Sequence, residues 1–267
     1  MTFDAVAVAT AAADAAGGVI HRYFRATLGV ETKGDDSPVT LADQGAEAAI
    51  RAILHAHCPD HAIIGEEMGG TATGRYTWMI DPIDGTRAFI TGRPIFATLI
   101  ALLDDGVPIL GLIDQPITGE RWLAHNNALH FTGPHGTPGT RRIGTIADAE
   151  LSCTSPEMFS PAQHANFQTL AAACRRVTYG GDAYAYGLLA LGQIDIIAEA
   201  DLKPWDWAAL VPVIEAAGGS VTDWHGAKLT LESDGTVLAL GDPRHRDAAV
   251  SALSRRSPPD PIGITHP

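Results

Sequence analysis

Two carboxylates three residues apart stand in a turn after an apolar run in the first half of the chain. Asp81 and Asp84 belong to Asp-Pro-Ile-Asp-Gly-Thr, directly after Trp78–Ile80. The apolar run indicates a strand, and Gly85 and Thr86 open a short helical segment. A strand-to-helix corner of this kind places hard oxygen ligands beside free backbone N–H groups. It therefore suits a hard cation that is bridged to a phosphate group.

Two further acidic motifs strengthen this interpretation. Glu66 and Glu67 follow the apolar run 62–64, and Asp206 opens a second apolar helix within Lys-Pro-Trp-Asp-Trp. Taken alone, each acid is explained as a turn residue, a helix cap or a solvated side chain. Three such motifs in one chain favour a shared site. Phosphate ester hydrolysis typically uses two cations about 3.5–4 Å apart, one activating water and one stabilising the leaving oxygen.

The three motifs, in this order, resemble the inositol monophosphatase family of metal-dependent phosphomonoesterases. The resemblance runs from about residue 33 to residue 241, nearly the whole chain. It implies that Glu66, Asp81 and the carbonyl of Ile83 bind one ion. It implies that Asp81, Asp84 and Asp206 bind a second, so that Asp81 bridges the two.

The ligand set predicts the cofactor. All-oxygen ligation points to Mg²⁺, with Mn²⁺ as a possible substitute, and we expect two or three ions per site. Asp84 and the backbone N–H groups of Gly85 and Thr86 are predicted to bind the phosphate.

A further group must take a proton from the attacking water. The resemblance implies a Thr–Asp dyad, and the matching residues are Thr86 and Asp43, with Glu67 in a supporting hydrogen bond. Asp43 also lies three residues after Thr40, so a helix-capping role is the alternative. The local sequence leaves both open, and only the resemblance favours catalysis.

The second half of the chain indicates a branch of the family. Leu210 replaces the glycine that inositol phosphatases typically have after Trp-Asp-x-Ala-Ala. Together with the segments 84–92 and 180–187, this resembles the histidinol-phosphatase branch, which acts in histidine biosynthesis. We therefore expect hydrolysis of L-histidinol phosphate. The alternatives are an inositol or broad-specificity sugar or nucleotide phosphatase, and a non-catalytic binding or scaffold member of the family.

Histidinol phosphate carries an ammonium group and an imidazole, so its pocket should contain carboxylates and aromatic rings. Glu199 lies seven residues before Asp206, the spacing of a family residue that contacts substrate. Asp182 lies in a segment that lines the pocket in the family. Arg87 and Lys33, the latter on the family's mobile loop, complete the predicted substrate-binding residues.

Composition and charge limit the kinds of partner and the cellular compartment that we expect for this chain. The formal net charge is -13, which argues against nucleic acid and anionic membranes as partners. Three widely spaced cysteines among 267 residues fit a reducing compartment. The first apolar stretch lacks a preceding basic residue, so we expect a helix rather than a signal peptide, and a cytoplasmic protein. The resemblance implies a homodimer.

The hydrophobic pattern predicts the order of elements. In the first half we expect a helix over 3–28, a helix capped by Thr40, and strands at 61–64, 76–81, 95–103, 107–114 and 121–124. In the second half we expect helices at 161–175, 183–192, 206–217 and 244–255, and strands at 194–199, 220–223 and 236–240. Pro212 should kink the third of these helices.

Successive strands in the first half predict an antiparallel sheet with helices, and the alternation in the second half predicts an α/β unit. With the resemblance, the fold class is a layered αβαβα sandwich that mixes α+β and α/β character. We place an N-terminal subdomain at 1–140, a C-terminal subdomain at 141–256 and a disordered tail at 257–267, with the loop-like segment 132–140 at the boundary.

Overall fold

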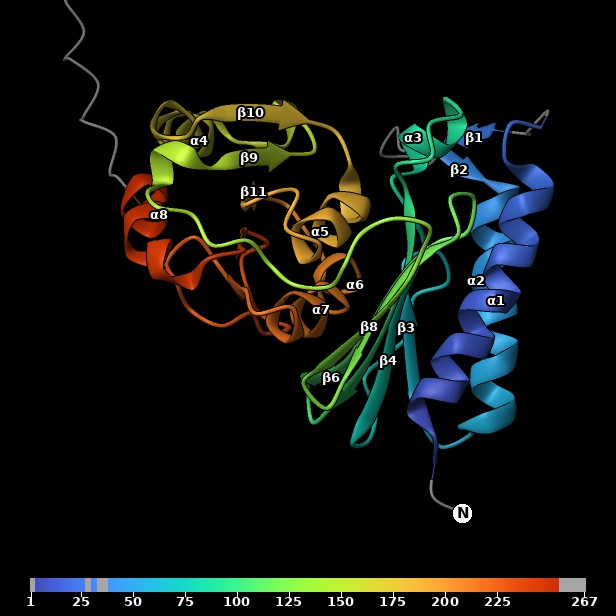
Figure 1. Cartoon of the computed structure of the whole chain (residues 1–267). Coiled ribbons are helices and arrows are strands. Elements are labelled where there is room, and N and C mark those ends of the chain that lie inside the picture. Colours follow the sequence, from blue (N-terminus) through green and yellow to red (C-terminus); the bar gives the residue numbers. More distant parts are fainter. Residues whose placement is uncertain (1–2, 27–29, 33–37, 255–267) are drawn as a thin grey trace, which may run out of the picture.

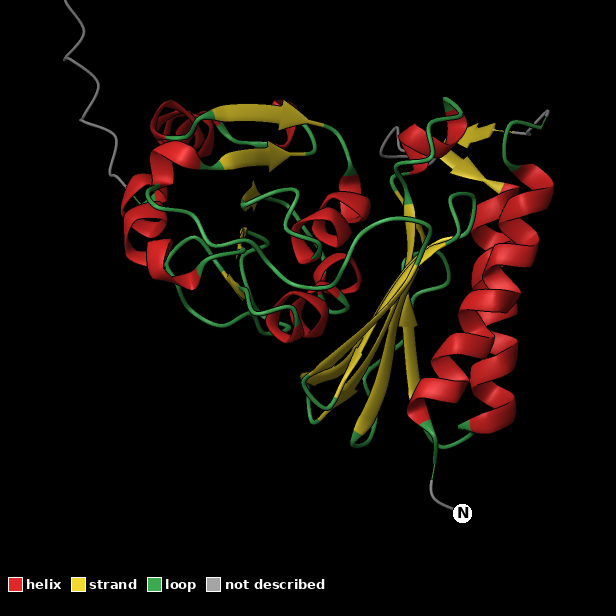
Figure 2. Cartoon of the chain, viewed as in Figure 1, coloured by secondary structure: helices red, strands yellow, loops and turns green. Residues whose placement is uncertain are grey.

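The computed structural model describes residues 3–26, 30–32 and 38–254. They form five layers: two long helices, a six-stranded sheet, a layer of short helices, a five-stranded sheet and a last pair of helices (Figure 1). Figure 2 shows both sheets enclosed by helices, which confirms the αβαβα sandwich. Lys33 and the predicted tail 257–267 lie outside the described residues. Among the described helices, none combines the length and the apolar composition needed to cross a membrane.

The first sheet has its strands in chain order. They are β3 (Ala62–Gly65), β4 (Tyr76–Asp84), β5 (Ala97–Asp104), β6 (Val107–Gln115), β7 (Glu120–His125) and β8 (Ala128–Thr132). Neighbours pair antiparallel, as predicted, except β3 and β4, which are parallel. The two strands run in the same direction because the segment 66–75 returns the chain to the edge of the sheet at which β3 began. As a result β3 ends beside Ile80, and the N–H of Glu66 donates to the Ile80 carbonyl at 3.2 Å.

Two helices cover the outer face of this sheet, α1 (Ala5–Tyr23) and α2 (Leu41–His57), running side by side (Figure 1). The Asp4 side chain caps α1 by accepting a hydrogen bond from the N–H of Ala7 at 3.1 Å. The helix ends five residues earlier than predicted. Phe24 adopts an extended backbone there, and its ring packs against Phe89 at 5.7 Å between centroids.

A short antiparallel pair, β1 (Val30–Thr32) and β2 (Pro38–Thr40), precedes α2, and α3 (Thr86–Ile90) follows β4. The inner helical layer consists of α5 (Asp182–Ala190), α6 (Pro204–Trp207) and α7 (Leu210–Ala216). This layer packs against both sheets, with Trp207 of α6 almost completely buried in the shared core.

The second sheet is mixed, in the order β10-β9-β11-β13-β12. Its strands are β9 (Glu150–Cys153), β10 (Arg176–Tyr179), β11 (Ile196–Glu199), β12 (Ser220–Thr222) and β13 (Val237–Leu240). Its outer face is covered by α4 (Pro161–Ala173) and α8 (Arg246–Leu253). Short 3₁₀ turns occur at Ile146–Asp148, Pro156–Met158 and Pro243–His245.

Five strands were missed from the sequence: β1, β2, β8, β9 and β10. Each has three to five residues, and β8 and β10 lie at sheet edges with largely exposed side chains. Strands this short carry too little hydrophobic pattern to be recognised. The chain leaves the first sheet at Thr132 and enters the second at Glu150, so the predicted boundary near residue 140 falls between the sheets. The division into subdomains stays a prediction.

The predicted helix over 206–217 is broken into α6 and α7, with Ala208 and Ala209 between them. Pro212 explains the break. A regular helix would need the N–H of residue 212 to bond to the carbonyl of Ala208, and proline has no N–H. Asp206 consequently stands on a separate four-residue helix.

A buried glutamate that the sequence analysis did not single out holds the turn after β3. Glu47 of α2 is completely buried, and its carboxylate accepts from the N–H groups of Glu67 at 2.8 Å and Met68 at 3.1 Å, and from Arg51 Nε at 2.8 Å. A Cβ on Gly65 would lie 2.3 Å from Glu47 Oε1. The turn that carries Glu66 is therefore fitted to this carboxylate.

We predict that Glu47→Gln lowers the free energy of unfolding by about 2–4 kcal/mol. The amide keeps the shape of the side chain but offers one oxygen, whereas both carboxylate oxygens of Glu47 are in use. Urea unfolding measures the effect. The matched control is Glu150→Gln, because Glu150 pairs with Arg176 at the surface and should contribute little. Equal effects of the two substitutions would contradict a special role for Glu47.

Candidate active site

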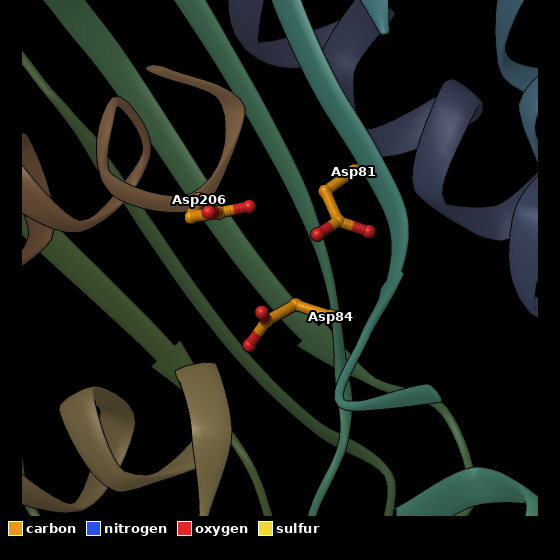
Figure 3. Close-up of side chains that lie close together, drawn as sticks. All are labelled: Asp81, Asp84 and Asp206. Atoms are coloured by element: carbon orange, nitrogen blue, oxygen red, sulfur yellow. The ribbon is translucent and has the colours of Figure 1, made fainter. Parts of the chain in front are cut away.

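Three carboxylates meet between the first sheet and the inner helical layer. Asp81, Asp84 and Asp206 each offer an oxygen, and these oxygens all lie within 4.8 Å of one another. Figure 3 shows the three side chains pointing toward a common space, two from β4 and one from α6. Within the part of the chain that the structure describes, this is the one group of acidic, histidine or cysteine side chains with such spacing. All three belong to the motifs from which a metal site was predicted.

Asp81 and Asp84 face the same way because β4 contains a bulge. Along a regular strand, residues three apart point to opposite faces of the sheet. Here Asp81 pairs with Leu99 and Asp84 with Ala97, so β4 has one more residue than β5 in this interval. The extra residue returns the second carboxylate to the face of the first.

Local contacts fix the shape of the bulge. The Asp81 side chain accepts from the N–H of Ile83 at 3.0 Å, and the buried Thr98 hydroxyl donates to the carbonyl of Pro82 at 2.7 Å. Pro82 is tolerated at this place because a bulge leaves an N–H out of the ladder. The strand predicted to end at residue 81 therefore continues to Asp84.

Asp206 is oriented by the start of its own helix. Its Oδ2 accepts from the backbone N–H of Lys203 at 2.7 Å, and Pro204 occupies the first turn, where a missing N–H costs nothing. Buried Trp207 anchors α6 against the first sheet. The motif Lys-Pro-Trp-Asp-Trp thus contains the start of a helix and, next to Asp206, the buried tryptophan that anchors this helix.

Burial and mutual repulsion raise the pKa values of these acids. Desolvation comes first for Asp81, whose pKa lies well above its usual range, and the charges of Glu66, Asp84, Asp206 and Asp43 add to it. The pKa of Asp84 is raised in the same way, by burial and then by Asp182 and Asp206. Burial raises the pKa of Asp206 to about 7. A site that gathers buried acids at this density suits a cation.

The predicted metal ligand Glu66 and the predicted catalytic residue Glu67 come from the turn after β3, and the predicted catalytic residue Asp43 comes from α2. Glu66 is exposed and directly follows β3, the strand that runs parallel to β4. Its negative charge raises the pKa of Asp81. Glu67 is half-buried, with its N–H held by Glu47. Asp43 is buried in the first turn of α2, and its charge also acts on Asp81. The effect of its charge on Asp81 is compatible with the dyad, and its position in the first turn of the helix is compatible with a cap.

Gly85 and Thr86 form the corner between β4 and α3. Gly85 has a φ of 94°, which favours glycine, and a Cβ there would lie 2.9 Å from the Asp182 carboxyl group. The Thr86 hydroxyl donates to the carbonyl of Ile83 at 3.2 Å. Ile83 itself is buried, so this hydrogen bond ties the Thr86 hydroxyl to the strand that carries Asp81 and Asp84.

A cavity of about 170 Å³ opens beside the three carboxylates. Its lining includes Asp84 and Asp206, the predicted substrate residues Asp182 and Glu199, and Asp201. The other lining residues are apolar, namely Met158, Ala183, Ala200, Leu202 and Leu210, or carry a hydroxyl group, namely Tyr186 and Thr154. Among the described residues, no Lys, Arg or His lines this cavity.

Of the four predicted substrate residues, only two line the cavity. Glu199 and Asp182 lie in the cavity wall, and burial raises the pKa of Asp182 to about 6. Arg87 is exposed on α3, outside the lining, although its positive charge acts on Asp182. Lys33 lies outside the described residues. Thr154 and Met158 were not predicted, because they come from a segment without a motif.

The family model described as "Inositol monophosphatase family" matches residues 3–257. The "Bifunctional phosphatase IMPL2, chloroplastic" of Arabidopsis thaliana is 47% identical over 258 residues, which cover 92% of this chain and 74% of that protein. The "Histidinol-phosphatase" of Mycobacterium tuberculosis is 38% identical over 234 residues, covering 85% and 90%.

Solved structures agree. An inositol monophosphatase from Zymomonas mobilis superposes with a TM-score of 0.85 at 44% identity, covering 93% of this chain and 97% of that one. The inositol monophosphatase from Anabaena gives a TM-score of 0.81 at 28% identity, covering 95% and 96%. The motifs, the fold and the acidic group thus have one explanation: the chain belongs to the inositol monophosphatase family and is a phosphomonoesterase.

Proposed function

We propose that this phosphomonoesterase is Mg²⁺-dependent and that its preferred substrate is L-histidinol phosphate. The choice of this substrate rests on one observation, the acidic cavity beside the three carboxylates. Asp182, Glu199 and Asp201 face it, and no basic residue of the described chain lines it. A cationic alcohol is the chemical class that such a wall favours. Histidinol-phosphatases at 36–38% identity support the choice.

The donor set fits the proposed metal. Three buried or half-buried carboxylates converge within 4.8 Å, and all the donors are hard oxygens. We propose that Asp81, Asp84 and Asp206 hold one Mg²⁺, and that Glu66, Asp81 and the Ile83 carbonyl hold another. A third ion and Mn²⁺ fit the same donors. Bound cations of this kind activate water and stabilise the leaving oxygen.

The residues around the metal ligands have separate proposed tasks. Thr86, with Asp43 behind it, takes part in removing the proton of the attacking water, and Glu67 supports them. Asp84 and the N–H groups of Gly85 and Thr86 hold the phosphate. The bulge of β4 supports these roles, because it brings Asp84 and the start of α3 to the same side as Asp81.

At the alcohol end, Glu199 and Asp182 recognise the cationic part of the substrate. Arg87 and Lys33 stay predictions as substrate residues, since Arg87 lies outside the cavity lining and Lys33 outside the described residues. A cytoplasmic location and a homodimer likewise stay predictions. An inositol or broad-specificity phosphatase is the second candidate, because relatives named as a bifunctional phosphatase and as an inositol-1-monophosphatase also match the chain.

Phosphate release from histidinol phosphate and from inositol 1-phosphate, measured side by side with and without Mg²⁺, tests the proposal. We predict that histidinol phosphate is preferred and that Glu199→Gln lowers kcat/KM for it at least tenfold, because a buried charge partner is lost. Hydrolysis of p-nitrophenyl phosphate, an ester without a cationic alcohol, should hardly change. Equal turnover of the two natural esters would favour the second candidate.

Asp84→Asn should abolish turnover while the fold is retained. The substitution keeps the shape of the side chain and removes one charge from the group of three acids. A rate loss of at least about 10²-fold is the usual scale for a lost electrostatic stabiliser. Steady-state kinetics and circular dichroism measure the two properties. Activity and Mg²⁺ dependence like those of the wild type would refute the assignment of Asp84.

Magnesium should stabilise the fold, and more so at higher pH. The pKa values of Asp81, Asp84 and Asp206 are raised in the folded protein. In a chelating buffer their contribution to stability is therefore fully present below the ordinary value near 4 and is lost as the pH rises through the folded value, about 7 for Asp206. Cations bind the ionised form and reverse this loss.

The measurement is the melting temperature between pH 5 and pH 8, with EDTA and with millimolar Mg²⁺. The gap between the two curves should widen with pH in the wild type and should narrow in Asp206→Asn, which removes one titrating group. A gap that is independent of pH, or one that is unchanged in the variant, would count against a site built from these acids.

A further inference from the structure

Glu199 is a buried carboxylate with neutral hydrogen-bond donors on both oxygens. Its side chain is 4% exposed at the end of β11. The backbone N–H of Thr154 donates to Oε1 at 2.7 Å, and the hydroxyl of Tyr186 donates to Oε2 at 2.8 Å. Thr154 and Tyr186 line the cavity together with Glu199.

The charges that surround Glu199 are of its own sign. Asp84, Asp182 and Asp206 interact with it electrostatically, and no basic residue of the described chain lines the cavity. A buried carboxylate needs hydrogen bonds to remain in such a place. The two donors supply these bonds without neutralising the charge. Each oxygen keeps a second lone pair, so the group can still accept from a ligand.

We propose that Tyr186 is a positioning residue for substrate recognition: with the N–H of Thr154, its hydroxyl holds the Glu199 carboxylate toward the cavity, ready for the cationic part of the alcohol. This inference rests on the proposed function. Two donors on opposite oxygens fix the plane of the carboxylate, which a single donor would not do. The ring of Tyr186 is itself 1% exposed within the shared core, so its hydroxyl has little freedom to move.

The same helix supplies a matched control. Tyr184 also donates its hydroxyl to a buried glutamate, Glu120, at 2.7 Å. It packs against Trp122 and is not part of the cavity lining. Tyr184→Phe and Tyr186→Phe therefore remove equivalent tyrosine–glutamate hydrogen bonds from α5, one remote from the cavity and one in its wall.

The test is a double-mutant cycle of Tyr186→Phe and Glu199→Gln, measured on the ester that the wild type hydrolyses best and on p-nitrophenyl phosphate. Tyr186→Phe should raise KM for the preferred ester on the order of tenfold, the scale of one hydrogen bond to a charged group, with little change in kcat. The double variant should be no worse than Glu199→Gln alone, because Tyr186 would act through Glu199. Tyr184→Phe should leave KM unchanged on both esters.

The pH dependence of KM adds a readout that a purely structural role would not move. The bonds from Thr154 and Tyr186 lower the pKa of Glu199 against the raising effect of burial. Removing the Tyr186 hydroxyl should therefore shift the acid limb of the KM profile to higher pH. Additive losses in the cycle, an equal loss on p-nitrophenyl phosphate, or no effect of Glu199→Gln on the preferred ester would overturn the inference. A preference for inositol 1-phosphate would contradict the proposal of a cationic substrate. The same double-mutant cycle, measured on that ester, would still decide whether Tyr186 acts through Glu199.

Discussion

One extra residue in β4 determines where the negative charges of this protein meet. Without the bulge between Asp81 and Asp84, these two side chains would lie on opposite faces of the first sheet. One of them would then point toward the core beneath α1 and α2, which is built mainly from apolar side chains. With the bulge, both reach the layer between the sheets, where Asp206 arrives from α6.

The remaining elements can be understood as supports for this concentration of charge. The parallel pairing of β3 with β4 brings Glu66 to the same edge as Asp81, and buried Glu47 holds the turn on which Glu66 stands. Pro212 separates α6 from α7, so that Asp206 starts a short helix of its own. Each device has a local physical reason, and all of them act on the same few oxygens.

Much of this could be predicted from the sequence, for identifiable reasons. The acids of the three motifs stand beside apolar runs and turn residues, so their types and surroundings indicated a metal site. Long periodic segments such as α2 and β5 indicated the helices and an antiparallel sheet, and the resemblance of the motifs to a known family implied the layered sandwich. The parallel direction of β3 could not be foreseen, because strand direction depends on where the segment 66–75 leads. Glu47 and the Tyr186–Glu199 contact escaped notice because they are made by residues distant in sequence. The edge strands β8 and β10 have only four or five residues and few buried side chains, so their hydrophobic pattern is weak.

The three carboxylates come from different structural units, and this has a consequence for cooperativity. Asp81 and Asp84 belong to the first sheet, whereas Asp206 belongs to the helical layer that also packs on the second sheet. An ion held by all three would join these units by a bond that neither can make alone. Local opening of either unit would then release the ion, so amide hydrogen exchange in β4 and in α6 should slow together when the ion binds. Substitutions far from the ligands should therefore lower the affinity for the cation if they loosen the packing of the helical layer, because they separate Asp206 from Asp81 and Asp84.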